Sequence, residues 1–497
     1  MSLTITQKIQ KERPGAEGVV FGVFQGDRID EHPFFQHLSP SSKAYLKRFA
    51  KKGFFAEPGE VDFVVFPSGR PSVAFLVGLG KQQKWQRRHF LLFMRKLVSL
   101  AGSQKVKSLA VDLPSLDYAA DMQARMAHLA VEQLLFAAYR FRKYKKHDER
   151  KQRLQSVEVR LSETTGVHRA LTQAKIVGKY VALCRDLANT PGGDMTPTVL
   201  ANHARELARQ TGCTVTVLDR KGMEKERMGA ILGVARGSVE EPKFIRMEYR
   251  GNGTAAPLVY IGKGVTFDSG GINLKPEQGM KDMHMDMAGG AAVLCACAAI
   301  AALKLRINVT AIVPAVENMP SGSGFRPGDV LVSRSGKTIE IANTDAEGRV
   351  ILADALDYAV DMKPACIVDV ATLTGAAMVA LGYYRTALFA SDDRFRDELL
   401  DLGERTGEYL WPLPLGDEYT ADIKGTVADV SNLGKHQRVG GASYGAAFLQ
   451  AFIKNVPWAH LDIAPTMTSV DGQYLSPGAT GVGTHLLVAL AMQRSIS

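Results

Sequence analysis

The chain has 497 residues, of which 46% are hydrophobic and 23% charged, and its formal net charge is +10 at pH 7. This length and apolar content exclude a disordered protein and exceed one typical core, which predicts two domains. The basic excess leaves open a partner with acidic groups, such as nucleic acid.

The amino-terminal third of the chain alternates strand and helix patterns. Short apolar or alternating runs predict strands, and longer stretches with helical spacing predict helices. The predicted strands are 18–24, 62–66, 72–79 and 107–113, and the predicted helices are 86–100 and 122–139. This order indicates a smaller amino-terminal α/β domain, which we place at residues 1–165.

A long helical pattern follows and ends ahead of Pro191-Gly192-Gly193. We therefore predict a linker helix at residues 166–190 and a larger catalytic α/β domain at residues 191–497. Alternating strands and helices in this domain predict a mixed, largely parallel central sheet. The strands are 258–261, 309–313, 366–370 and 460–463, and the helices are 286–303 and 349–360.

The sequence GKGVTFDSGG occupies residues 262–271, directly after the buried strand predicted at 258–261. Lys263 and Asp268 therefore lie at the carboxyl end of a strand, where open α/β sheets bind their ligands. The glycines permit positive φ angles and close approach of the backbone. Lys275 and Asp286 follow within the next stretch of chain.

A second cluster, NTDAEGR at residues 343–349, places Asp345 and Glu347 two residues apart, with Arg349 just beyond. Acidic side chains at i and i+2 of an extended or looped backbone leave on the same side, and like charges that close favour a cation between them. Such a pair alone is also typical of a solvated loop. The first cluster makes a metal site the better interpretation.

Together the two clusters supply four carboxylates, Asp268, Asp286, Asp345 and Glu347. Four carboxylates with bridging capacity suit two divalent ions about 3.5 to 4 Å apart, an arrangement used in hydrolysis. A lysine binds metal only when neutral, which burial and nearby dications favour by lowering its pKa, and Lys263 is the candidate. Carboxylates with one lysine and no histidine suit manganese, zinc or magnesium.

These residues resemble the leucine aminopeptidase family, also called cytosol aminopeptidases, whose signature NTDAEGR stands at residues 343–349. The resemblance includes GKGVTFDSGG, Lys275-Pro276, Met285-Asp286-Met287 and DVATLTG at 369–375, and it weakens ahead of the catalytic domain. It implies a metal-dependent aminopeptidase that removes leucine-like residues from the amino termini of peptides. It also implies a homohexamer.

The resemblance further implies which residues hold the metal. Two divalent ions per subunit are expected, with Asp268 and Glu347 bridging them and a bridging hydroxide attacking the scissile carbonyl. The substrate's free α-amine is expected to bind one ion, which makes the enzyme an exopeptidase. The expected ligands are Lys263, Asp268, Asp286, Asp345 and Glu347.

Residues outside this ligand set also receive roles from the resemblance. Lys275 is expected to polarise the peptide carbonyl, and Arg349 to hold a bicarbonate ion that carries protons. Met283, Thr372 and Gly375 are expected to surround the side chain of the first substrate residue.

The chain departs from the family pattern in three loops that bear on substrate preference. These are residues 189–194, Pro465 in place of the usual glycine, and the more basic segment 432–438.

Three alternatives to this reading remain. The basic run 140–146, with interleaved aromatic residues, is typical of nucleic-acid-binding proteins, although a solvated helix end or linker is the stronger explanation. A dinuclear hydrolase of phosphodiesters would carry a similar metal cluster. A scaffold protein with a dead site is disfavoured because every implied ligand is present. The chain has no H-E-x-x-H motif, which argues against a zincin.

The cysteines and the first thirty residues indicate the cellular compartment of the protein. The five cysteines are odd in number, include no C-x-x-C and lie mostly in apolar stretches, which indicates buried free thiols in a reducing compartment. The first thirty residues lack the apolar segment of a signal peptide, and no uninterrupted apolar run predicts a membrane span. We therefore expect a cytoplasmic protein with no membrane partner.

Overall fold

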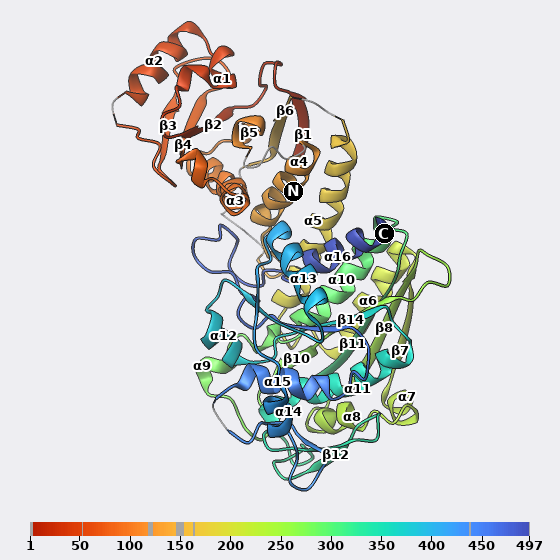
Figure 1. Cartoon of the computed structure of the whole chain (residues 1–497). Coiled ribbons are helices and arrows are strands. Elements are labelled where there is room, and N and C mark those ends of the chain that lie inside the picture. The colour runs from red at the N-terminus through yellow and green to blue at the C-terminus, as the bar shows by residue number, and fades with distance from the viewer. Residues whose placement is uncertain are drawn as a thin grey trace. The chain divides into compact units, whose positions relative to one another are not determined.

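The computed structural model describes residues 3–51, 53–117, 123–145, 154–162, 165–436 and 439–496 (Figure 1). Two compact units are present, one formed by Met1–Gly178 and Asp471–Ser476, the other by Lys179–Val470 and Pro477–Ser497. Helix α5 (Val167–Asn189) contributes residues to both units. The predicted two-domain α/β organisation is confirmed, while the sequence-based boundaries at 165 and 190 stay predictions.

A six-stranded sheet forms the centre of the amino-terminal unit, in the order β1-β6-β5-β2-β4-β3. All neighbouring strands are parallel except β3 and β4. The four predicted strands are present as β2 to β5, and the sequence prediction missed β1 and β6. The strands are β1 (Thr4–Ile9), β2 (Gly18–Phe24), β3 (Val61–Val65), β4 (Val73–Gly80), β5 (Ser108–Asp112) and β6 (Ser156–Leu161).

Helices cover both faces of this sheet because side chains along a strand alternate between its two faces. Val19 and Phe21 of β2 pack with α1 (Pro33–Gln36) and α2 (Pro40–Ala50). Val20 and Phe24 of the same strand pack with α3 (Arg87–Ser103) and α4 (Gln123–Ala138) on the other face. Both predicted helices are confirmed as α3 and α4.

The second unit contains a nine-stranded sheet in the order β16-β15-β18-β14-β9-β11-β8-β7, with β10 paired to β11. The central strands β18, β14, β9 and β11 are parallel. Strand β15 is antiparallel to β18 but parallel to β16, and β8 is antiparallel to both β11 and β7. The predicted mixed, largely parallel sheet is therefore confirmed. The strands are β7 (Thr214–Leu218), β8 (Lys243–Arg250), β9 (Leu258–Gly262), β10 (Gly264–Asp268), β11 (Asn308–Asn318), β14 (Cys366–Ala371), β15 (Thr386–Ala390), β16 (Leu410–Pro412) and β18 (Trp458–Asp462).

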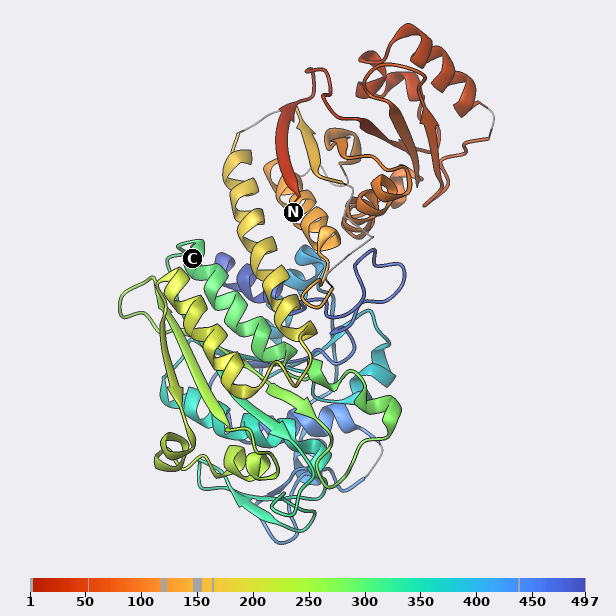
Figure 2. The same ribbon diagram turned by 180° about the vertical axis from the view of Figure 1, so that it is seen from behind.

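Two helical layers enclose this sheet. Val259 and Ile261 of β9 pack in the core that includes α8 (Gly229–Val234), α11 (Glu347–Asp361) and α15 (Gly441–Gln450). Tyr260 points to the opposite face, where its hydroxyl donates a hydrogen bond to Leu487 O at 3.0 Å. That face is covered by α6 (Pro197–Thr211), α10 (Ala288–Ala302) and α16 (Thr484–Ile496), and Figure 2 shows α6 and α10 side by side.

Helix α10 belongs to the core of this unit. Within the described residues, the stretch Glu277–Ala302 is long and apolar enough to cross a membrane, but 94% of its most apolar window is buried in the protein. Glycines at its start allow direct backbone contact with the sheet. A Cβ atom at Gly289 would lie 2.0 Å from Val370 O, and one at Gly262 would lie 2.3 Å from Gly289 O. The amino-terminal end of α10 is therefore fixed against β9 and β14.

Candidate metal centre

The predicted site residues come from four segments at one edge of the catalytic sheet. Lys263 lies between β9 and β10, and Asp268 ends β10. Asp286 follows the short helix η5 (Met283–Met285) that precedes α10. Asp345 lies in a second short helix, η6 (Thr344–Ala346), and Glu347 is the first residue of α11. Lys263 and Asp268 therefore lie at the carboxyl ends of strands, as expected for open α/β sheets, whereas Asp286, Asp345 and Glu347 are supplied by the short helices η5 and η6 and the start of α11.

Two lysines connect the four predicted carboxylates. Lys263 Nζ lies 2.8 Å from Asp286 Oδ2 and 2.9 Å from Glu347 Oε1. The side chain of Lys263 is only 4% exposed.

The second lysine makes the matching pair of contacts. Lys275 Nζ lies 2.8 Å from Asp268 Oδ2 and also contacts Asp345 Oδ1. The structure thus brings together both lysines and all four carboxylates, although the two sequence clusters are far apart along the chain.

Several oxygens in this cluster are available to a cation. Asp268, Asp286 and Glu347 each offer one carboxylate oxygen within 4.8 Å of the others. Asp286 Oδ2 and Glu347 Oε1 are buried and accept no hydrogen bond from the described residues, apart from their ion pairs with Lys263. Four carboxylates facing two ammonium groups also leave a surplus of negative charge. Buried oxygens with surplus negative charge fit divalent cations.

The electrostatics of the cluster reflect this surplus. Desolvation and repulsion by the nearby negative charge of Asp268 raise the pKa of Asp286 to about 7 and that of Glu347 to about 8. Desolvation lowers the pKa of Lys263, but the carboxylates around it outweigh this and raise the pKa well above its usual value. The protein side chains alone therefore keep Lys263 charged. Lys263 must be neutral to bind a metal, so the metal ions themselves have to lower its pKa.

Asn318, which the sequence reasoning missed, holds two of the carboxylates. It is the last residue of β11 and is fully buried. Its Nδ2 donates to Asp268 Oδ1 at 2.8 Å and Thr344 O at 3.0 Å, and lies 3.5 Å from Glu347 Oε2. An uncharged amide at a strand end has no sequence signature. Only its position beside the strand that carries Asp268 could have suggested it.

We expect Asn318→Ala to lower metal affinity and activity by about 10- to 100-fold, because partners that orient ligands have effects of that size. The measurement is metal binding by titration calorimetry together with turnover. Asn308→Ala is the matched control, since Asn308 lies at the other end of β11 and donates to loop carbonyls such as Ala255 O. Equal losses in both variants would show that Asn318 only stabilises the fold.

Thr372 is the predicted pocket residue that the structure places in direct contact with the cluster. Its hydroxyl donates to Asp286 Oδ1 at 2.6 Å, and its carbonyl accepts a hydrogen bond from Lys263 Nζ at 3.1 Å. Gly375 begins α12 (Gly375–Leu381), and a Cβ atom there would meet no atom within 4 Å. Met283 is half-buried at the start of η5. The open space at Gly375 is compatible with a pocket wall.

Arg349 lies in the first turn of α11, buried and apart from the two lysines. Its Nη1 donates to Asn432 O at 2.9 Å, and its Nε has no hydrogen-bond partner in the described part of the chain. Desolvation lowers its pKa to about 10, against the raising effect of Glu347 and Asp462. A buried guanidinium with an unused donor fits a small anion.

Asn432 is a second residue whose role the sequence did not indicate. It is fully buried within the basic loop 432–438, of which residues 437 and 438 lie outside the described residues. Its Oδ1 accepts hydrogen bonds from Ala342 N at 2.8 Å and Asn343 N at 3.3 Å. This loop therefore positions the start of the second carboxylate cluster.

A two-unit α/β chain with buried carboxylates and lysines at the carboxyl edge of its sheet has the features of a metal-dependent hydrolase. Family models give the particular class: residues 182–488 match the catalytic domain of the cytosol aminopeptidase family, and residues 20–148 match its amino-terminal domain. The chain belongs to the cytosol aminopeptidase family.

Curated and solved relatives agree with this assignment. A probable cytosol aminopeptidase of Syntrophotalea carbinolica is 41% identical over 484 residues, covering 96% of each chain. A mutant of tomato leucine aminopeptidase is 31% identical with a TM-score of 0.88, covering 99% of this chain and 97% of that one. The bottromycin maturation enzyme BotP in complex with Mn is 33% identical with a TM-score of 0.84, covering 97% and 100%.

The chain is therefore a metal-dependent aminopeptidase, a hydrolase that acts on peptides and uses divalent metal ions. The comparisons support neither nucleic-acid binding nor phosphodiester hydrolysis. In the basic run, Arg140 Nη1 donates to the carbonyls of Ala137 and Tyr139, which caps the end of α4. Of the basic run 140–146, Lys146 lies outside the described residues, as do residues 147–153 that follow it.

Proposed function

We propose that the five predicted ligands hold two divalent ions and that the chain removes leucine-like residues from the amino termini of peptides. The observation that carries this proposal is the buried cluster in which Lys263 and Lys275 each contact two carboxylates. When bound, the ions supply Lewis-acid chemistry and lower the pKa of water. The proposed ligands are Lys263, Asp268, Asp286, Asp345 and Glu347.

Lys275 is the proposed electrophilic residue. Its side chain is 15% exposed, whereas that of Lys263 is 4% exposed, so Lys275 is the more accessible of the two ammonium groups. An ammonium beside the scissile carbonyl donates a hydrogen bond to the oxygen on which negative charge develops. Asp268 and Asp345 hold Lys275 charged, because their attraction raises its pKa against the effect of desolvation.

Arg349 is proposed to hold bicarbonate through its free donor, where the anion would move a proton between water and the leaving amine. Thr372, Gly375 and Met283 are proposed to form the pocket for the first substrate side chain. The contact of Thr372 with Asp286 supports this, because it places one pocket residue against the metal ligands.

Metal identity, assembly and location are further parts of the proposal. Manganese or zinc is proposed, with magnesium also compatible, since oxygen-rich sites accept all three. The Mn complex of BotP supports manganese. A homohexamer in the cytoplasm is proposed from the family resemblance, and native mass spectrometry would test the hexamer.

Hydrolysis of leucine p-nitroanilide before and after chelation tests the metal-dependent function. We expect activity to disappear with a chelator and return when manganese or zinc is added, because the surplus of carboxylates leaves the site incomplete without cations. Full activity in the metal-free protein would contradict the metal proposal. Preparing the assay in carbonate-free buffer tests the anion, since the rate should then fall and recover with added bicarbonate.

A further inference from the structure

The amino-terminal unit contains a cavity that the peptidase reaction does not use. Its volume is about 640 Å³, within the range of small-molecule sites. It is lined by Gln25, directly after β2, by the end of β4 and by residues of α3. Because β2 and β4 are parallel neighbours, the cavity lies at the carboxyl edge of their sheet, where open α/β sheets bind ligands.

Apolar and aromatic side chains form one part of the lining. Leu79, Trp85 and Phe93 are buried, and Leu92 is 37% exposed. Trp85 is held in place, since its Nε1 donates to Leu116 O at 2.9 Å and its ring stacks on that of His89 at 5.7 Å. A fixed indole beside leucine and phenylalanine provides a flat apolar surface on which a ring can pack.

Positive charge forms the other part of the lining. Lys81, Lys84 and Arg88 are exposed at the cavity, and among the described residues their side chains form no ion pair or hydrogen bond. Among the described residues, Glu57 is the only acidic residue of the lining, and its Oε1 accepts a hydrogen bond from Gln25 Nε2 at 2.9 Å. The cavity therefore combines apolar surface with cations that the protein does not neutralise.

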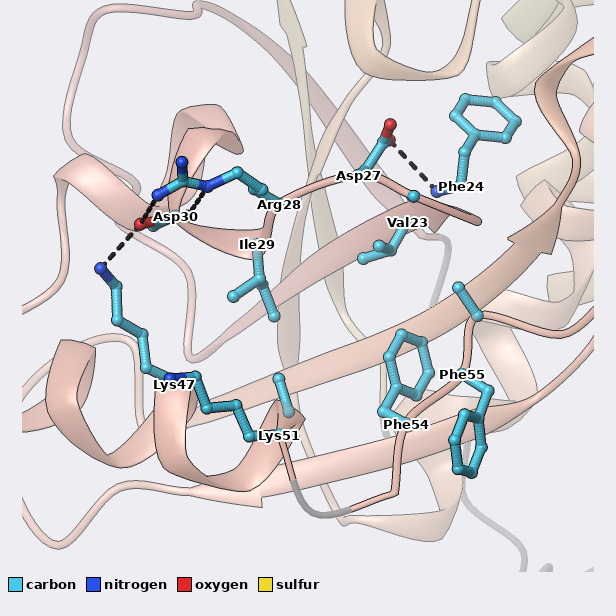
Figure 3. Close-up of a pocket in the computed structure, with 13 residues that line it drawn as sticks. Val23, Phe24, Asp27, Arg28, Ile29, Asp30, Lys47, Lys51, Phe54 and Phe55 are labelled. Atoms are coloured by element: carbon cyan, nitrogen blue, oxygen red, sulfur yellow. Dashed lines mark hydrogen bonds and ion pairs between the residues drawn. The ribbon is translucent and has the colours of Figure 1, made fainter.

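A second cavity in the same unit shows the opposite arrangement (Figure 3). There Asp30 lies 3.1 Å from Arg28 Nη2 and 2.7 Å from Lys47 Nζ, so its carboxylate already pairs with two of the cations. An anion entering that cavity would compete with Asp30 for Arg28 and Lys47. In the cavity beside Trp85, Lys81, Lys84 and Arg88 have no such competitor among the described residues.

We propose that the cavity beside Trp85 binds a small organic anion in which a carboxylate or phosphate is attached to a flat ring. The ring packs on Trp85, Leu92 and Phe93, and the anionic group accepts hydrogen bonds from Lys84 and Arg88. Each half of such a ligand matches one part of the lining. Inorganic phosphate would contact only the positively charged part of the lining, and an uncharged ring only the apolar part.

Titration calorimetry on the full chain with two probes tests the proposal and separates the two anions. Adenosine 5′-monophosphate carries a phosphate, and its halves are inorganic phosphate and adenosine. Indole-3-acetate carries a carboxylate, and its halves are acetate and indole. We expect at least one probe to bind about tenfold or more tightly than each of its halves. Absence of binding by both probes, or equal binding by phosphate or adenosine, would overturn the proposal.

Matched variants locate the binding. Arg88→Gln should weaken the bound probe about tenfold, the usual effect of losing a hydrogen bond from a charged group. Arg48→Gln removes an equally exposed arginine from α2 of the same unit, outside this cavity, and should change nothing. Leu92→Gln should weaken the ring-bearing probe without affecting inorganic phosphate.

An unchanged thermal midpoint and far-UV circular dichroism spectrum of all three variants would show that they are folded. Equal weakening by Arg48→Gln and Arg88→Gln would mean non-specific attraction to a basic surface and would overturn the proposal.

Discussion

Replacing Asp345 by asparagine is expected to reduce peptide hydrolysis by at least roughly a thousandfold, because bound metal ions supply several kcal/mol of transition-state stabilisation. Asparagine has nearly the same volume as aspartate, and the side chain of Asp345 is 34% exposed, so the fold should be unaffected. The substitution removes the negative charge that faces Lys275. It therefore removes a proposed metal ligand and, at the same time, a contact that positions Lys275, the proposed electrophilic residue.

The measurement is kcat/KM with leucine p-nitroanilide, combined with metal content by mass spectrometry and the thermal midpoint. Asp361→Asn is the matched control: it removes the contact of Asp361 with Arg334 Nη1 at 2.8 Å, at the far end of α11, and should retain full activity. Near-normal turnover of Asp345→Asn would contradict the ligand role of Asp345. Loss of activity with a large fall in the thermal midpoint would indicate unfolding instead.

The strands that position the site could be predicted because they are short, buried and apolar. β9, β14 and β18 have every residue buried. β9 is a continuous apolar run, and β14 and β18 are apolar apart from Asp369, His460 and Asp462, so local sequence shows all three. β1 was missed for the opposite reason, since four of its six residues are polar or charged and it pairs with β6 from Thr4 opposite Ser156. Pairing over that separation leaves no local signal.

The backbone conformation of the glycines around Asp268 was predicted only in part. Positive φ is found at Gly270 and Gly271, as their residue type predicted. Gly262 and Gly264 instead have ordinary φ angles. A side chain is excluded at both positions because another backbone segment lies close by: a Cβ at Gly264 would lie 2.8 Å from Pro314 O. Residues 264–268 were not predicted as a strand but form β10, which pairs with β11.

Charged site residues could be found from sequence because carboxylates close together in a chain are costly without a cation. The lysines and carboxylates of both clusters do meet in the structure. Asn318 and Asn432 could not be found in this way, since an uncharged amide carries no such cost and its partners come from distant segments. The same holds for the cavity beside Trp85, whose lining is assembled by the fold.

Substituting Gly289 by alanine is the change expected to damage the fold most. The new methyl group would lie 2.0 Å from Val370 O and 3.2 Å from Lys263 N, and both are backbone atoms that cannot rotate away. Helix α10 would have to move off β9 and β14. Overpacking of this kind costs about 3 kcal/mol or more. Because Lys263 and Asp286 lie on either side of this contact, the shift should also separate the proposed metal ligands.

The free energy of unfolding and the metal affinity should therefore both fall in Gly289→Ala, as measured by denaturant titration and calorimetry. Gly102→Ala is the matched control, because Gly102 also lies within a helix, α3, and a Cβ there would meet no atom within 4 Å. Alanine should stabilise α3 by up to about 1 kcal/mol, since it is the better helix former. A Gly289→Ala protein as stable as the Gly102→Ala protein would show that α10 can shift without cost and that the close backbone contact does not hold the metal centre together.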